Sequence, residues 1–230
     1  MAKHGKKYNK ALEQVKRGQL LSAEQALSQV KQLAFAKFDE SVDVHVNLGI
    51  DAAKGEQVVR GSVILPFSKG KKVKVLVFAK GDYAEKAQKA GADYVGVEDL
   101  IEKINGGWVD FDYAIATPDL MAIVGKVAKI LGPKGLLPNK KLGTVTFDVE
   151  EVISDLKKGR QFFKNDKSGL VHFTIGKVSF DSAQLLQNLG AFVKALVSAK
   201  PAASKGKFLK KMTVASTMGV GLTVNADELV

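Results

Sequence analysis

One stretch decides the fold class of this chain: residues 73–79 read VKVLVFA. Six of these seven residues are apolar, which is typical of a parallel strand buried between two layers of helices. Residues 41–48, in contrast, read SVDVHVNL, and their strict alternation indicates a strand with one buried face. The pattern therefore changes near residue 70, and two kinds of sheet are expected in one chain.

Downstream of residues 73–79, predicted strands and helices alternate. Pro118 suits the first turn of a helix, because its ring fixes the backbone angle that a helix needs. Such alternation predicts a Rossmann-like, three-layer α/β arrangement. The expected helices are 82–90, 98–104, 118–131 and 149–158, and the expected strands are 93–97 and 113–117.

The two flanks of this segment return to the alternating pattern. Ser22 is a predicted helix cap, and the loop 165–169 is predicted to join a β-hairpin. A helix is expected at 182–199, and a last strand pair at 208–213 and 220–224. Each flank has only about 70 residues, which is short for an independent core.

We therefore predict an α+β fold with two domains. Residues 1–66 and 160–230 together form a discontinuous domain I, and residues 67–159 form an inserted α/β domain II. Insertions of this kind are tolerated because chain termini usually lie close together.

The charge distribution points to a polyanionic partner. The chain has 35 basic and 24 acidic residues, a net charge of +11. Residues 1–66 carry +3, residues 67–159 carry +2 and residues 160–230 carry +6. A nucleic acid should therefore contact domain I first. The alternative is a lysine-rich surface that binds nucleic acids without specificity or acts like a chaperone.

The absence of cysteine excludes disulfides and thiolate metal sites and fits a reducing compartment. The basic start of the chain is followed by no apolar segment of the secretory type. No apolar run approaches the about 18 residues of a membrane span. We expect a cytoplasmic protein without a membrane partner.

An enzyme that uses nucleotides is the rival hypothesis, motivated by the α/β segment. Residues 80–83 after the first buried strand read KGDY rather than a glycine-rich fingerprint, and no P-loop occurs. The GPKG motif at 132–135 follows a helix, whereas a phosphate-binding loop should precede one. The three histidines and the Asp110–Asp112 pair form no partnered motif. We predict no catalytic residues, no cofactor and no metal site.

Two segments of the flanks have the composition of RNA contacts. Lys37 and Phe38 place a cation beside an aromatic ring at an element boundary, although the pattern alone slightly favours Phe38 as a core residue. Residues 216–221 combine hydroxyl groups with two glycines, which allow close backbone approach. A plain hairpin turn is the alternative there.

Loop and edge cations are the other candidates. Lys167 and Ser168 supply charge and a hydroxyl group in the predicted hairpin loop. Lysines near the last strand suit phosphate contact, and a solvated basic edge strand is the alternative explanation. These lysines are at positions 205, 207, 210 and 211.

Seven sequence blocks, in order, resemble the bacterial large-subunit ribosomal protein L-one family, which forms the mobile lateral stalk. The resemblance covers essentially the whole chain. The blocks are KFDESV (37–42), RGSVILP (60–66), GADYVG (91–96), ATPD (116–119), GPKGLLPN (132–139), NDKSG (165–169) and TMG (217–219).

The resemblance implies a protein that binds large-subunit ribosomal RNA through domain I. It also implies contact with the deacylated transfer RNA of the exit site and repression of the protein's own operon by messenger binding. The free protein is expected to be a monomer, with a hinge at Pro66, Phe67 and Gly159. The implied RNA contacts are Lys37, Phe38, Ser41, Lys167, Ser168, Thr217, Met218 and Gly219.

The chain departs from the family pattern at a few positions. Phe67-Ser68 stands where His-Gly is usual, Lys134 replaces a common arginine, and Lys140 and Val220 replace prolines. The first three departures bear on the hinge and on exit-site contacts. Val220 adjoins the main RNA-binding segment, where a proline would have fixed the backbone.

Overall fold

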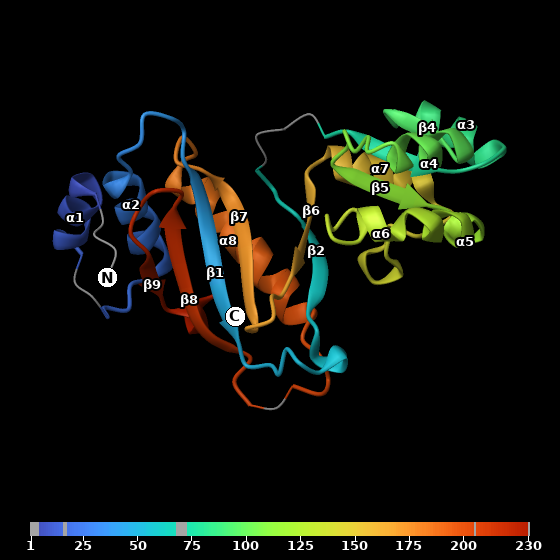
Figure 1. The fold of residues 1–230 in the computed structure, drawn as a ribbon. Coiled ribbons are helices and arrows are strands. Elements are labelled where there is room, and N and C mark those ends of the chain that lie inside the picture. Colours follow the sequence, from blue (N-terminus) through green and yellow to red (C-terminus); the bar gives the residue numbers. More distant parts are fainter. Residues whose placement is uncertain (1–4, 16–17, 68–72, 205, 230) are drawn as a thin grey trace. The chain divides into compact units, whose positions relative to one another are not determined.

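The computed structural model describes residues 5–15, 18–67, 73–204 and 206–229. The protein mixes helices with both antiparallel and parallel strands, consistent with the predicted α+β class. By contacts the chain divides into two compact units. Unit 1 is residues 1–69 with 162–230, and unit 2 is residues 70–161 (Figure 1).

Unit 1 is built on a sheet with the strand order β7-β1-β8-β9. The strand β1 (Ser41–Leu48) is central and pairs antiparallel with β7 (Leu170–Lys177) and β8 (Leu209–Ser216). The short strand β9 (Leu222–Val224) extends the sheet beside β8. Strands from both ends of the sequence therefore lie side by side (Figure 1).

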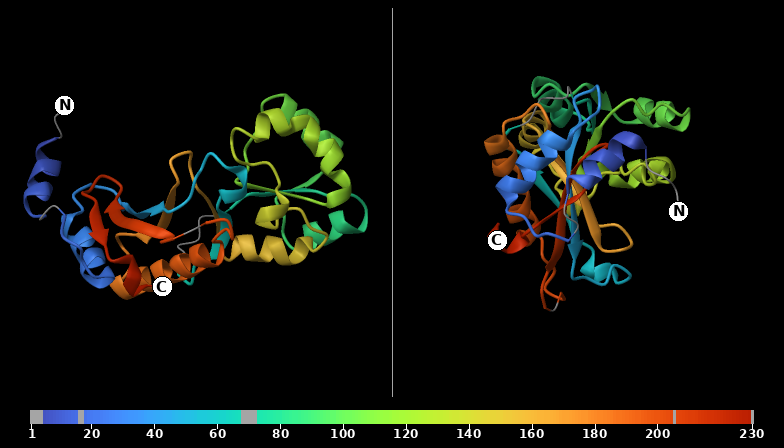
Figure 2. Two further views of the ribbon diagram at one scale, coloured as in Figure 1. Left: turned by 90° about the horizontal axis from the view of Figure 1, so that it is seen from below. Right: turned by 90° about the vertical axis from the view of Figure 1, so that its left-hand side faces the viewer.

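The alternating sequence of β1 separates the two faces of this sheet. Val42, Val44 and Val46 are buried, whereas the residues between them are only half-buried. The helices α2 (Ala23–Leu33) and α8 (Ser182–Ser198) lie on the buried face, as Figure 2 (left) shows. Their apolar side chains complete the core of unit 1, and among the described residues no helix packs over the opposite face of β1 and β7.

Local sequence signals determine where these helices begin. Ser22 accepts a hydrogen bond from the backbone of Gln25, as predicted, and Asp181 forms a reciprocal capping box with Gln184. Both contacts satisfy backbone donors that a helix start leaves free. The remaining elements of unit 1 are α1 (Lys6–Glu13), η1 (Gly55–Gln57), β2 (Arg60–Ile64), β6 (Arg160–Lys164) and η5 (Ala226–Glu228).

The predicted hairpin around residues 165–169 is wrong. β6 pairs with β2 in a separate two-stranded sheet, whereas β7 pairs with β1. Only the isolated bridge Asn165–Val171 joins the two arms among the described residues. Both β6 and β7 thus pair with strands far away in the sequence and not with each other. The alternation of apolar residues does not indicate which partner a strand takes.

Unit 2 contains a parallel sheet with the strand order β4-β3-β5. All of β3 (Val75–Phe78) is buried, as its continuous apolar run predicts. It pairs with β4 (Tyr94–Gly96) and β5 (Tyr113–Ala116). The helices of this unit are α3 (Asp82–Lys89), α4 (Glu98–Asn105), η4 (Lys140–Leu142) and α7 (Val149–Lys157), with a further helical segment at 118–131.

The predicted continuous helix at 118–131 is interrupted. It consists of η2 (Pro118–Leu120), α5 (Met121–Val124), η3 (Gly125–Val127) and α6 (Ala128–Leu131). Gly125 stands at the break, and glycine is a weak helix former. Leu120, Val124, Val127 and Leu131 are nevertheless all buried. Hydrophobic spacing therefore identified the buried face correctly but not the continuity of the helix.

Two features bear on function in the part of the chain that the structure describes. No helix in that part of the chain is both long and apolar enough to span a bilayer. No group of three or more potential metal ligands occurs among the described residues either.

Candidate nucleic-acid interface

The start of β1 and the end of β8 meet at one end of the sheet of unit 1. The hydroxyl group of Thr217 accepts a hydrogen bond from the Ser41 N–H at 2.9 Å. The Thr217 N–H donates to the Ser41 carbonyl at 3.0 Å, and the hydroxyl also lies 3.3 Å from that carbonyl oxygen. These contacts join two of the predicted RNA contacts into one rigid junction.

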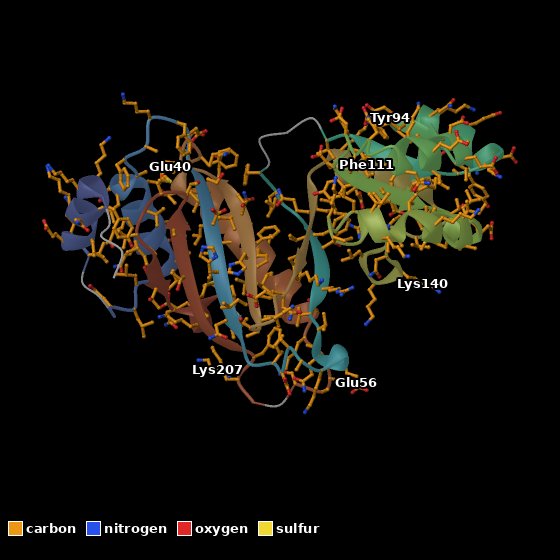
Figure 3. The ribbon with its side chains drawn as sticks, viewed as in Figure 1. Glu40, Glu56, Tyr94, Phe111, Lys140 and Lys207 are labelled. Carbon is orange, nitrogen blue, oxygen red and sulfur yellow. The ribbon has the colours of Figure 1, made fainter. Side chains whose placement is uncertain are left out.

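A buried carboxylate fastens the neighbouring backbone to the same junction. Glu40 is 1% exposed, and its two oxygens accept hydrogen bonds from Ala36 N–H at 2.8 Å and Met218 N–H at 3.0 Å. Figure 3 labels Glu40 at this end of the sheet. Burial raises the pKa of Glu40, but hydrogen bonds from Ser216 and from the Met218, Ala36 and Phe35 backbones outweigh it and leave this pKa below its usual value. The buried group is therefore an anion held by donors.

The predicted contact residues project from this fastened backbone. Phe38 is 57% exposed and Met218 is 53% exposed, so both are among the few large apolar side chains of the described residues that face solvent. Lys37 and Thr217 are exposed beside them in sequence. The site therefore presents two apolar surfaces suited to stacking on a base or sugar, next to a cation and a hydroxyl group. The alternative of Phe38 as a core residue is wrong.

Gly219 owes its place to close packing. A Cβ atom at this position would overlap the hydroxyl oxygen of Ser216, which also hydrogen-bonds Glu40. The Gly219 N–H donates to the Ser216 carbonyl at 3.0 Å, which closes the turn. Glycine is therefore required here for space, not for an unusual backbone angle.

Sequence patterns did not identify several supporting residues. Lys177 pairs with Ser41 across the strands and donates to its hydroxyl oxygen at 2.7 Å. Asp39 accepts hydrogen bonds from the backbone and the hydroxyl group of Ser179. Only the register of β7 on β1 brings these residues to the site, and the pairing of distant strands is not visible in a single sequence.

Lys167 and Ser168 lie at the opposite end of β7. Leu170, where that strand begins, pairs with Asn47, whereas Lys177 pairs with Ser41. At about 3.4 Å per residue, roughly 24 Å of strand separates the two ends. The structure thus brings together the predicted contacts on β1 and β8 but does not bring this loop to them.

Asp166 shapes the Lys167–Ser168 loop. One of its carboxylate oxygens accepts hydrogen bonds from the backbones of Ser168 and Leu170, both at 2.8 Å. These bonds, that from Leu170 foremost, lower the pKa of Asp166. Both Lys167 and Ser168 are exposed at the tip of the loop.

Basic side chains gather at this second end of the sheet. Lys211 pairs with Asn47, and Lys210 and Lys207 precede it along the chain. All three are exposed, and Figure 3 labels Lys207 far from Glu40. Lys205 lies outside the described residues. The first end of the sheet therefore combines apolar and hydroxyl groups with Lys37 and Lys177, whereas the second end carries a cluster of lysines.

Residues 30–220 match the model of the Ribosomal protein L1p/L10e family. The chain belongs to this family. Members of the L1p/L10e family are structural proteins of the large ribosomal subunit that bind ribosomal RNA, and the family is not one of enzymes. The matched residues include every predicted RNA contact but begin within α2, so α1 lies outside the match.

Two of the departures noted in the sequence fall on described parts of unit 1 of this L1p/L10e protein. Val220 is buried, with an exposed fraction of 6%. The backbone of Phe67 is held by the buried side chain of Asn188, which accepts from its N–H at 3.0 Å and donates to its carbonyl at 2.7 Å. Ser68 lies outside the described residues.

The other two predicted hinge residues, Pro66 and Gly159, each lie where the local backbone suits their residue type. Pro66 is exposed directly after Leu65, a buried core residue. Gly159 has a φ angle of 104°, in the region that favours glycine. A backbone of this kind suits a sharp change of chain direction after α7.

Proposed function

We propose that this protein binds large-subunit ribosomal RNA at the lateral stalk. The contacting part is domain I, residues 1–66 with 160–230. The observation that carries the proposal is the junction of Ser41 with Thr217, which holds Phe38 and Met218 exposed on a backbone fastened by Glu40. Exposed aromatic and long apolar side chains can stack on unpaired bases or pack against sugars of an RNA.

The chemistry of this junction fits specific recognition, and that of the opposite end fits affinity. Phe38 and Met218 offer surfaces for stacking, while Ser41 and Thr217 offer hydroxyl groups. Lys167, Lys207, Lys210 and Lys211 supply the charge for phosphates. Two further RNA contacts are proposed. Ser168 supplies a hydroxyl group from the loop, and Gly219 allows the backbone to approach the RNA closely.

Two further roles follow from family membership as part of the proposal. The inserted domain II, residues 67–159, turns on a hinge at Pro66, Phe67 and Gly159 and takes part in releasing the exit-site transfer RNA. The free protein, a monomer, represses translation of its own operon by binding a messenger structure that resembles the ribosomal site. A translation reporter fused to the operon leader tests the second role, since repression should be lost with a site variant such as Thr217→Val.

The direct test of the binding role replaces residues 67–159 with a short flexible linker. The shortened protein should bind an isolated stalk RNA with an affinity near that of the full chain. Circular dichroism first establishes that the shortened protein is folded. If the folded variant does not bind stalk RNA, domain I alone is not the binding site and the proposal fails.

The salt dependence of binding separates this function from nonspecific binding. Purely electrostatic binding falls steeply as salt is raised. Binding to stalk RNA should survive moderate salt, whereas binding to a random RNA of the same length should not. Equal loss for both RNAs would favour the nonspecific alternative.

A further inference from the structure

A polar row crosses the open face of the sheet between the two ends of the predicted interface. His45 of β1 and His172 of β7 pair directly across the strands, with their Nδ1 atoms 2.7 Å apart. Their rings meet edge to face, with centroids 5.0 Å apart. Two residues further along each strand, the hydroxyl group of Thr174 donates to the carboxylate of Asp43 at 2.5 Å. The centre of the face is therefore polar.

The contacts of the pair favour one arrangement of its protons. The carboxylate of Asp166 lies 3.8 Å from Nε2 of His172, and a carboxylate favours a hydrogen on the nitrogen that faces it. His172 then has an unprotonated Nδ1, which accepts the hydrogen bond from Nδ1–H of His45. A neutral imidazole has one N–H, so Nε2 of His45 carries a free lone pair. Among the described residues, that nitrogen has no hydrogen-bond partner.

The surroundings of the pair are richer in anions and acceptors than in cations. Asp43 flanks His45 on its own strand, and Asp166 faces His172 from the loop. On β8, the uncharged Thr213 lies opposite His45, and Lys211, two residues before Thr213, lies opposite Asn47. Burial and the neighbouring His172 lower the pKa of His45, and Asp43 offsets only part of that effect. At neutral pH His45 is therefore an uncharged acceptor.

An acceptor surface of this kind suits hydrogen-bond donors and not phosphates. Two carboxylates repel a phosphate group, although the whole chain has an excess of positive charge. The 2′-hydroxyl of ribose is the donor that an RNA helix displays most regularly, along its wide minor groove. Phosphates then lie toward the ends of the face, near Lys177 and near Lys207, Lys210 and Lys211.

We propose that Nε2 of neutral His45 accepts a hydrogen bond from a ribose 2′-hydroxyl of the bound RNA. His172 and Asp166 act as positioning residues, because they set the tautomer that leaves this nitrogen free. The inference rests on the proposed function and assigns the centre of the sheet to ribose recognition. It also fixes the sign of a pH effect, since a protonated His45 no longer accepts.

Two variants at position 45 test the proposal with the full chain and a stalk RNA fragment. His45→Gln keeps an acceptor but does not titrate, and His45→Phe keeps a ring but has no acceptor. At pH 7.5, His45→Gln should bind within about twofold of wild type, whereas His45→Phe should bind about three- to tenfold more weakly. Gln187→Ala, at an exposed position of α8, is the matched control and should leave affinity unchanged.

The pH series supplies the second readout. Wild-type affinity relative to that of His45→Gln should be constant from pH 8 to 7. It should fall below pH 6 and level off at about the three- to tenfold loss expected for His45→Phe, because protonated His45 no longer accepts the hydrogen bond. A relative affinity that rises on acidification would indicate a cationic histidine on a phosphate and would overturn the proposal. A ratio independent of pH would overturn it equally.

Single 2′-deoxy substitutions along the RNA identify the ribose. At one position the deoxy substitution should weaken wild-type binding several-fold and have no further effect on His45→Phe. Absence of such coupling at every position would contradict ribose recognition by His45. Failure of the wild-type protein to bind stalk RNA would instead refute the proposed function, so the two failures are distinguishable.

Discussion

Ser41 and Thr217 are 176 positions apart in the sequence and share a hydrogen bond of 2.9 Å between the Ser41 N–H and the Thr217 hydroxyl oxygen. The bond ties the first strand of the sheet to the loop that follows β8. Because Phe38 lies three residues before Ser41 and Met218 directly follows Thr217, the geometry of the proposed RNA contact depends on this junction. Its removal should therefore affect binding more than folding.

Thr217→Val tests this dependence. Valine keeps the shape of threonine but removes its hydroxyl group, so stability should fall by about 1 kcal/mol, the usual value of one hydrogen bond. Affinity for stalk RNA should fall with little change in the salt slope, because no cation is lost. Filter binding at several salt concentrations measures both. An equal loss of affinity for random RNA would contradict the assignment of this site.

Glu40→Gln should weaken the fold at neutral pH. An amide keeps one acceptor and turns an N–H group toward a backbone donor, either Ala36 or Met218. Loss of a buried, charge-assisted bond should cost about 1–3 kcal/mol in the free energy of unfolding. Urea denaturation at pH 7 measures it, and Glu24→Gln, at an exposed position of α2, serves as the control.

The stability difference between wild type and Glu40→Gln should depend on pH. The pKa of Glu40 is lower in the folded protein, so ionised Glu40 stabilises the fold above the usual glutamate pKa of about 4.3. This stabilisation is lost as the pH falls through the lowered folded pKa. The stability difference between wild type and Glu40→Gln should therefore shrink below about pH 4. A difference that stays constant would show that Glu40 is not ionised in the fold.

The sequence predicted which face of a strand is buried better than it predicted which strands pair with each other. Alternation in residues 41–48 correctly marked one buried face, and Ser22 correctly marked the start of α2. The pairing of β6 with β2 was missed, because a strand pattern does not name its neighbour. Spacing also cannot distinguish an exposed Phe38 from a buried one, nor predict a buried carboxylate at position 40. The burial of Glu40 depends on contacts with Ser216 and Met218, far along the chain.

Asp166→Ala should loosen the loop that carries Lys167 and Ser168. The change removes the acceptor for the Ser168 and Leu170 N–H groups, so these amides should exchange hydrogen faster. Affinity for stalk RNA should fall because two predicted contacts lose their fixed geometry. Glu56→Ala, at an exposed position of η1 in the same unit, should change neither quantity. If hydrogen exchange at the Ser168 and Leu170 amides is unchanged in Asp166→Ala, then Asp166 does not hold this loop.

Asn188→Leu tests the anchoring of the predicted hinge. Asn188 is fully buried and bonds to both backbone groups of Phe67 and to the carbonyl of Ile175. Leucine has a similar branched shape but is larger and leaves these groups unpaired, so unfolding should become easier by about 1–3 kcal/mol or more. Denaturation measures the loss, and Gln187→Leu on the exposed side of α8 is the comparison. Equal stability of the two variants would mean that the Asn188 bonds do not hold the segment.

A ribose footprint on large-subunit ribosomal RNA tests the central claim most directly. Wild-type protein should protect one compact region within the stalk RNA. The same protection should remain when residues 67–159 are replaced by a linker and should weaken strongly with Thr217→Val. Protection that disappears with the linker variant while domain I stays folded, or that is indifferent to Thr217→Val, would contradict binding through the Ser41–Thr217 junction.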